Sequence, residues 1–94
     1  MSNVSSKAVI TVIGKDKVGI IAQVSAECSK FGANIIDISQ SVMKDYFAMI
    51  MLVDTADMKV SFAEFSEAMK TAGTELGVVI RATHEELFNA MHHV

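Results

Sequence analysis

Two glycines bracket a charged turn at the end of the first apolar segment. The apolar run stops at Gly14, charged residues follow at Lys15–Lys17, and a helical pattern begins with Gly19 in its first turn. The N–H groups and the positive dipole end of a helix N-terminus attract a carboxylate or a phosphate. Glycine has no side chain to keep a ligand from the backbone, so we expect a small anionic group to bind here.

A phosphate loop of the Walker type is excluded. Gly14 and Gly19 have the required spacing, but Ile20 and Ile21 stand where the motif needs Lys and Ser or Thr. For both glycines, a tight turn and close packing of a helix on a sheet is the alternative to ligand access. Asp16 is either an N-cap or an acceptor for the ammonium group of a ligand.

Four segments have the periodicity of strands. Lys7–Ile13 and Tyr46–Val53 are apolar on both faces, which predicts interior strands that are covered on two sides. Asn34–Val42 and Val78–Thr83 alternate between apolar and polar residues, as edge strands do. In the first of these edge strands, the apolar face is expected to hold Ile36, Ile38 and Val42, and the polar face Asp37, Ser39 and Ser41.

Helical spacing separates the strands. The first helix is expected to run from Val18 to Phe31, with Asp16 as its N-cap and Gly32 as its C′ stop. The second covers Phe62–Leu76, where apolar residues recur every three or four positions after a capping box that begins at Ser61. A second capping pattern at residues 83–86 predicts a short C-terminal helix over residues 84–92.

The resulting order is strand, helix, strand, strand, helix, strand, with a hairpin at Met43–Asp45. Right-handed crossovers, with the first and third strands inside, predict a four-stranded antiparallel sheet in spatial order 4-1-3-2. Both helices then lie on one face. This is an α+β sandwich of the ferredoxin-like βαββαβ type, with its core at residues 7–83 in a single domain over residues 1–94.

Composition limits the partners. The 94 residues carry a net charge of −3, and their eight basic residues form no stripe that could follow a phosphate backbone. We therefore expect no direct nucleic-acid partner. The longest apolar run, Tyr46–Val53, is far shorter than the roughly 20 residues that span a bilayer, and residues 1–7 have no apolar signal sequence. We expect a cytoplasmic protein without a membrane partner.

Three separated blocks resemble the ACT domain family. Asp16–Ile20 and Asn34–Asp37 fit its pattern within this order of elements. More narrowly, Thr11–Ile20, Asp37–Val42 and Phe88–Met91 are similar to small stand-alone prokaryotic ACT proteins related to the glycine cleavage system repressor. The resemblance implies a homodimeric regulatory module that binds an amino acid or a similar small effector at a subunit interface.

The resemblance also implies which residues bind the effector. The matching positions are Asp16, Lys17, Val18, Gly19, Ile20, Asn34, Ile35 and Asp37. No cofactor is implied, and the protein that would be regulated is unknown. The alternative for Asn34 and Asp37 is a turn-forming Asn and a solvent-facing Asp. The alternative for Lys17 is a solvated charge in the turn.

Metal binding and nucleophilic catalysis have little support. Three histidines are present, at His84, His92 and His93, but Phe88 stands where an H-E-x-x-H motif needs its second histidine. Cys28 occupies an apolar helix position without an adjacent cationic residue, which is typical of a buried, inert thiol. We expect neither a metal site nor a catalytic residue.

Two alternatives to a regulatory module stay open. The architecture also suits acylphosphatase, which needs an arginine in the turn after the first strand. Only Lys15 and Lys17 lie in that turn, and the sole arginine, Arg81, falls in the last strand. The other alternative is a dimeric scaffold that forms without a ligand. The expected function is an amino-acid-responsive homodimeric regulator that is not an enzyme.

Overall fold

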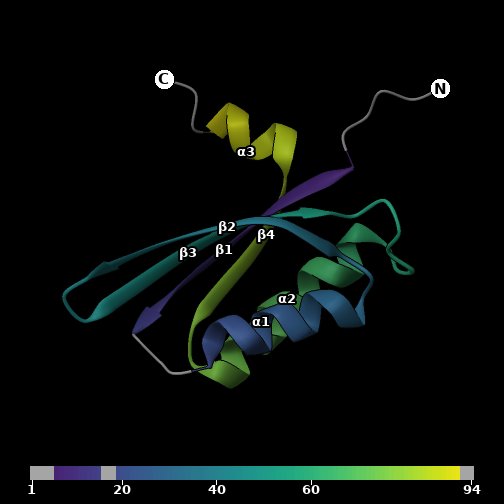
Figure 1. The fold of residues 1–94 in the computed structure, drawn as a ribbon. Coiled ribbons are helices and arrows are strands. Elements are labelled where there is room, and N and C mark those ends of the chain that lie inside the picture. The colour runs from purple at the N-terminus through teal and green to yellow at the C-terminus, as the bar shows by residue number, and fades with distance from the viewer. Residues whose placement is uncertain (1–5, 16–18, 92–94) are drawn as a thin grey trace.

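The computed structural model of the chain describes residues 6–15 and 19–91. The four strands form one antiparallel sheet in the order β2-β3-β1-β4. Figure 1 shows α1 and α2 together on one side of this sheet and α3 on the other side. The elements in chain order are β1 (Lys7–Lys15), α1 (Ile20–Lys30), β2 (Asn34–Met43), β3 (Tyr46–Asp54), α2 (Phe62–Leu76), β4 (Val79–His84) and α3 (Glu85–Met91).

The predicted topology is confirmed. Order β2-β3-β1-β4 is the expected spatial order 4-1-3-2, and both crossover helices lie on one face of the sheet. The bounds of α2 agree with the prediction at both ends. Strands β1, β2 and β3 run one or two residues further than predicted, and β4 begins and ends one residue later.

Both ends of α2 are fixed by local hydrogen bonds. At its start, the Glu64 N–H donates to Ser61 Oγ at 3.1 Å, and the Ser61 N–H donates to Glu64 Oε1 at 3.5 Å. These bonds form the predicted capping box. At its end, Gly77 adopts a left-handed φ of 78°, and the Val78 N–H donates to the carbonyl of Gly73 at 2.9 Å. This closure directs the chain into β4.

Helix α1 ends as predicted but does not begin as predicted. Gly32 has a φ of 82°, and the Ala33 N–H reaches back to the carbonyl of Cys28 at 2.9 Å, so Gly32 is the C′ stop. The N-cap is Gly19, whose φ of 88° is left-handed and incompatible with a helical residue. The predicted N-cap at Asp16 is therefore wrong, and Gly19 precedes the first turn instead of belonging to it.

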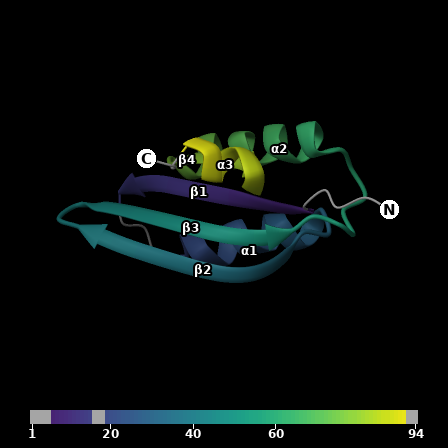
Figure 2. The same ribbon diagram turned by 90° about the horizontal axis from the view of Figure 1, so that it is seen from above.

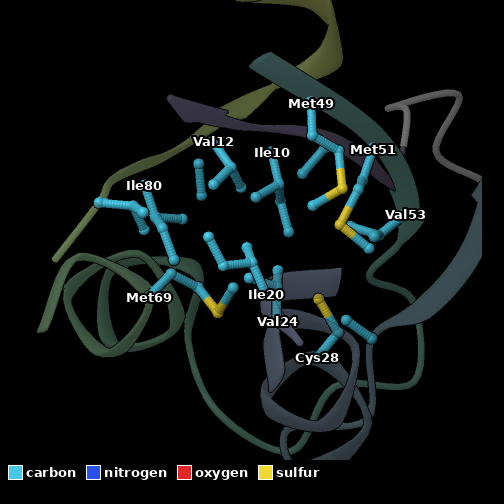
Figure 3. Packing of buried hydrophobic residues seen from close by; sticks show 14 of the residues in the cluster. Ile10, Val12, Ile20, Val24, Cys28, Met49, Met51, Val53, Met69 and Ile80 are labelled. Carbon is cyan, nitrogen blue, oxygen red and sulfur yellow. The ribbon is translucent and has the colours of Figure 1, made fainter. Parts of the chain in front are cut away.

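The core lies between the sheet and the two crossover helices. Ile10 and Met51 from the central strands are fully buried and face Val24 of α1 and Met69 of α2. Figure 3 shows these side chains converging in one layer, with the thiol of Cys28 at its margin. Methionine fills irregular gaps well because its chain is unbranched, which suits a core built from two strands and two helices.

The opposite side of the sheet, which we call the open face, is only partly covered. Figure 2 shows α3 over β1 and β4, with β2 and β3 extending beyond it. Val9 is buried, but Ile13 and Ile50 are about half exposed. The expectation that β1 and β3 are covered on both faces is therefore wrong at these positions. The physical reason is that the seven-residue α3 is too short to cover the face.

Strand β2 is an exposed edge with one irregularity. A bulge separates Ile35, which pairs with Val53, from Asp37, which pairs with Leu52. Because a bulge inserts one extra residue, Ile36 has no partner in the register, and Ile35 takes its place on the side that faces the helices. The regular alternation expected from Ile36 to Ile38 is therefore broken at Ile36. Asp37, Ser39 and Ser41 do share the opposite side, which is the open face.

The C-terminal helix is shorter than expected at its start. It begins at Glu85, because His84 belongs to β4 and stacks on the ring of Phe62 with centroids 3.9 Å apart. His92 and His93 lie outside the described residues. Of the helices in the described ranges, none is long and apolar enough to cross a membrane.

The buried thiol leads to a pH prediction. Burial, aided by the charge of Glu27, raises the pKa of Cys28 from its ordinary 9.0 to about 11. At pH 8 the thiolate fraction should be about 100-fold lower than in the unfolded chain, and so should the rate of reaction with a disulfide reagent.

The same shift makes the free energy of unfolding fall between pH 9 and pH 11. In this range the unfolded chain has already lost the thiol proton that the native chain keeps. The free energy of unfolding therefore falls by about 1.4 kcal/mol for each pH unit. Chemical unfolding measures the free energy of unfolding at these pH values. In Cys28→Ala the decrease that comes from the thiol should be absent. An equal decline in the variant would contradict the prediction.

Candidate functional site

The structure places five of the eight predicted site residues. Gly19 and Ile20 lie at the start of α1. Asn34, Ile35 and Asp37 lie at the start of β2. The other three, Asp16, Lys17 and Val18, lie outside the described residues.

The first half of the site is the N-terminus of α1. The carbonyl of Gly19 accepts the first helical bond, from the Gln23 N–H at 3.0 Å, and Gly19 has no side chain that could cap the turn. A Cβ built on Gly19 would meet no atom within 4 Å. The N–H groups of the first helical turn have no partner inside the helix, so this end can accept an anionic group from outside.

The second half is the start of β2. Asn34 pairs with Asp54 and Asp37 pairs with Leu52, so both side chains lie on the open face, whereas Ile35 lies on the side of the helices. All three are exposed. Oδ1 of Asp37 accepts the Ile38 N–H at 2.9 Å. A carboxylate beside an amide side chain can bind an ammonium group.

One chain does not bring the two halves together. Gly19 begins α1, and Asn34 follows its end, so the eleven residues of the helix separate them. At 1.5 Å per residue this is about 16 Å. Figure 1 shows β2 leaving the far end of α1. A single ligand with the size of an amino acid cannot contact both halves of one chain.

Gly14 packs closely against Val78 and does not line the candidate site. A Cβ on Gly14 would lie 2.5 Å from Cγ1 of Val78 and 3.0 Å from its Cβ. The space beside this glycine is therefore filled by the connection between α2 and β4. Of the two explanations for Gly14, close packing is the one that the structure supports.

Hollows lined by described residues lie elsewhere on the molecule. A cleft of about 380 Å³ runs between α1 and α2, and its charged side chains include Glu27, Lys30, Glu67 and Glu75. A recess of about 290 Å³ lies on the open face beside Phe88. Neither contains a predicted site residue. Sequence reasoning missed both, because each depends on how separate elements lie side by side.

The left-handed conformation of Gly19 gives a prediction. Gly19→Ala should lower the free energy of unfolding by about 1–2 kcal/mol, because an L side chain is strained at a φ of 88° although the space around it is open. Thermal unfolding checks this value. Ala22→Gly, at an exposed position within the same helix, is the opposite substitution and should cost about 1 kcal/mol through helix propensity. A neutral Gly19→Ala would contradict the left-handed conformation.

Comparison with known proteins identifies close relatives. The ACT domain family profile matches residues 6–83. A UPF0237 protein from Methanocaldococcus jannaschii is 46% identical over 89 residues, which cover 95% of this chain and 99% of that protein.

Solved structures agree with the observed fold. An ACT domain protein from Streptococcus pneumoniae has a TM-score of 0.79 and 41% identity, covering 94% of this chain and 99% of that one. A structure described as a glycine cleavage system transcriptional repressor has a TM-score of 0.68 and 24% identity. The matched region covers 82% of this chain and 44% of the repressor. At this level of identity the match shows a likeness of fold alone.

Proposed function

The chain belongs to the ACT domain family, and from this premise we propose that it is a cytoplasmic homodimeric regulator that binds an amino acid between two subunits. ACT domains are small-ligand regulatory modules. The observation that carries the proposal is the division of the site into two halves at opposite ends of α1. Gly19 is exposed at one end, where Ile20 is buried in the core, and Asn34, Ile35 and Asp37 are exposed at the other. We propose no catalytic role and no direct nucleic-acid partner.

Magnitudes favour a site that two chains share. Micromolar affinity needs about 8 kcal/mol. Hydrogen bonds to a charged carboxylate contribute roughly 1.5–3 kcal/mol each, and an exposed helix dipole adds up to about 1 kcal/mol. The N-terminus of α1 alone would therefore bind an amino acid weakly. A second set of contacts, to the ammonium group, would enclose the ligand and exclude water.

Strand β2 has the features of an edge that pairs with its own copy. It is ten residues long, has no proline or lysine, and exposes Val42 at 59%. Natural edges usually carry charges, bulges, prolines or short strands that prevent such pairing. On β2 the bulge and Asp37 are confined to residues 35–37, so the regular part of the edge is residues 38–42. The segment Ile38-Ser39-Gln40-Ser41-Val42 reads as apolar, Ser, Gln, Ser, apolar in either direction. A two-fold axis through Gln40 would therefore place like residues opposite each other.

This axis also matches donors and acceptors. The Ile38 N–H bonds within its own chain to Asp37, and we place the backbone groups of Ile38, Gln40 and Val42 toward the edge, since these alternate along a strand. In the pair, Ile38 lies opposite Val42 of the second chain and Gln40 opposite its own copy. Each pair exchanges two backbone hydrogen bonds, and Asp37 is released from Ile38.

The side of α1 next to β2 suits the same contact. Its charged residues Glu27 and Lys30 line the cleft toward α2. Helical spacing turns Ile21, Ser25 and Ser29 to the other side, above the edge of the sheet. An interface core is depleted of charge, so two α1 helices can lie together across the axis.

Antiparallel pairing of β2 would unite the two halves of the site. The start of one β2 would lie beside the end of the other, where the β2–β3 hairpin meets the end of β1. The chain leads from this end of β1 to Gly19. Helix α1 of one subunit would then bind the carboxylate of the amino acid, and the start of β2 of the other, where Ile35 faces the side of the helices, would enclose the ligand.

A thermal-shift screen with the twenty amino acids tests the function. A ligand at 100 times its Kd adds about 2.7 kcal/mol to the free energy of unfolding, which is about 10–20 °C in Tm for a chain of this size. We expect one amino acid or a small chemical group of them to raise the Tm. Flat values across the screen would favour the ligand-independent dimeric scaffold.

The role of Asp37 gives a matched pair of variants. Asp37→Asn should weaken the effector only a few-fold, because this exposed carboxylate lies on the open face and attracts the ammonium group from the strand edge without direct contact. Asp57→Asn removes an equally exposed charge at the turn after β3 and should leave the Kd unchanged. Titration calorimetry measures both values. Equal affinities in the two variants would remove Asp37 from the site.

A further inference from the structure

A second surface is separate from the β2 edge. Six large apolar side chains on the open face are each 45–63% exposed. We call them the open-face patch. They are Ile13, Tyr46, Ile50 and Val79 from the sheet and Leu87 and Met91 from α3.

The patch is larger than an isolated chain usually exposes. Six side chains of this size at about half exposure leave on the order of 600 Å² of apolar surface, at the upper limit for the largest patch on a typical monomer. A standard interface buries about 800 Å² on each partner. The patch and a polar rim together would reach that size.

The patch also has complementary parts. Helix α3 covers β1 and β4 and leaves β3 uncovered (Figure 2). Beside it lies the recess of about 290 Å³, lined by Thr11, Ile13, Ala48, Met49, Ile50 and Phe88. The element that would fill this space is a second helix with an apolar side. Helix α3 itself has such a side, because Leu87 and Met91 are exposed.

We propose that two copies of this chain pack with their open faces together, so that α3 of each copy fills the recess and covers β3 of the other. The two α3 helices would lie side by side between two sheets. Such a contact is isologous, since the same patch serves both partners. A second copy is the favoured occupant because the chain contains both the recess and the helix that fits it.

Charges agree with this arrangement. Lys15 and Arg81 are exposed on the open face, at its margin, and Glu86 is exposed on α3. Glu86 of one copy can therefore pair with Lys15 or Arg81 of the other, whereas Asp37 and Asp54 lie near the start of β2 and the end of β3, at the other margin of the face. Combined with pairing of β2, the contact gives a tetramer with two kinds of two-fold interface.

The oligomeric mass of the full chain tests the proposal. Val79→Lys and Leu87→Lys each place a charge in the patch at an exposed position. Each should halve the mass measured by sedimentation equilibrium, from about four chains of 10.2 kDa to two. Ala63→Lys adds the same charge at an exposed position on α2 and should leave the mass unchanged. Circular dichroism confirms that the variants are folded.

Tyr46 supplies an independent measurement. It is the only tyrosine, and the chain has no tryptophan, so its fluorescence reports on the patch directly. Acrylamide should quench it several-fold less in the wild type than in Val79→Lys.

The outcomes distinguish this contact from the β2 pairing. A wild-type chain that stays monomeric would overturn the open-face contact, and so would wild-type mass and quenching in both lysine variants. If the lysine variants have half the wild-type mass, the open-face contact is supported. If these variants still respond to an amino acid, the β2 dimer is supported independently of that contact. If the lysine variants of a wild-type dimer become monomers, the open-face contact stands and the β2 pairing is wrong.

Discussion

Replacing Gly73 by valine is expected to lower the Tm by about 10–20 °C. Gly73 is buried in the last turn of α2, and a Cβ there would lie 2.9 Å from Cγ1 of Ile80 and 2.9 Å from the carbonyl oxygen of Val78. The backbone N of Ile80 is 3.0 Å away, so rotation of a side chain cannot relieve the contact. Helix α2 would have to move away from β4.

The magnitude follows from opposing effects. Overpacking in a core costs typically 1–3 kcal/mol and occasionally more, whereas replacing a helical glycine gains less than about 1 kcal/mol. We expect a net loss of about 2–3 kcal/mol, and each kcal/mol is about 4–8 °C at this chain length.

Thr74→Val is the matched control for Gly73→Val. It places the same residue at the next, exposed position of α2 and removes only a 3.3 Å bond from Oγ1 to the carbonyl of Lys70. We expect a change of a few degrees at most. Thermal unfolding by circular dichroism measures both variants. Similar Tm values for the two would contradict the close approach of α2 to β4.

Gln40→Pro is expected to halve the mass of the assembly and to abolish the response to the effector. Proline has no N–H, and its ring would occupy the outer side of the β2 edge. Proline is tolerated on edge strands whose N–H points to solvent, so pairing of β2 with β3 should survive. Because each effector site needs residues from two chains, loss of β2 pairing removes the site as well.

Gln40→Ala separates the backbone from the side chain in this experiment. It removes the amide group of Gln40 and keeps the N–H, so the mass and the effector response should remain close to those of the wild type. Sedimentation equilibrium and the thermal-shift screen measure the two properties. A Gln40→Pro protein that is folded, has wild-type mass and responds to an amino acid would show that β2 does not form the shared interface.

The predicted elements follow closely from local sequence. Helix α2 agrees at both ends because Ser61 and Glu64 cap it through bonds that span three residues, and Gly77 ends it with a left-handed turn. The sheet order follows because the most apolar segments must lie inside and crossovers are right-handed. These determinants act over a few residues or through general chain geometry, so they can be read from the sequence.

Other features depend on packing between elements. The start of α1 was misplaced because the sequence does not state that Gly19 takes a left-handed φ. The apolar pattern around Ile13 and Ile50 predicts strands that are covered on both sides. The length and position of α3 leave these two side chains about half exposed. The bulge at Ile36 likewise shifts the faces of β2 in a way that regular alternation does not indicate.

For the candidate site, the sequence by itself determined the residue types: a glycine that leaves a helix end open and an Asn and Asp at the start of a strand. Only the tertiary structure decided that these halves lie at opposite ends of α1, and that Gly14 is closed by Val78. The physical reason is that hydrogen-bond capacity belongs to a residue, whereas distance and free space depend on every element packed between two positions.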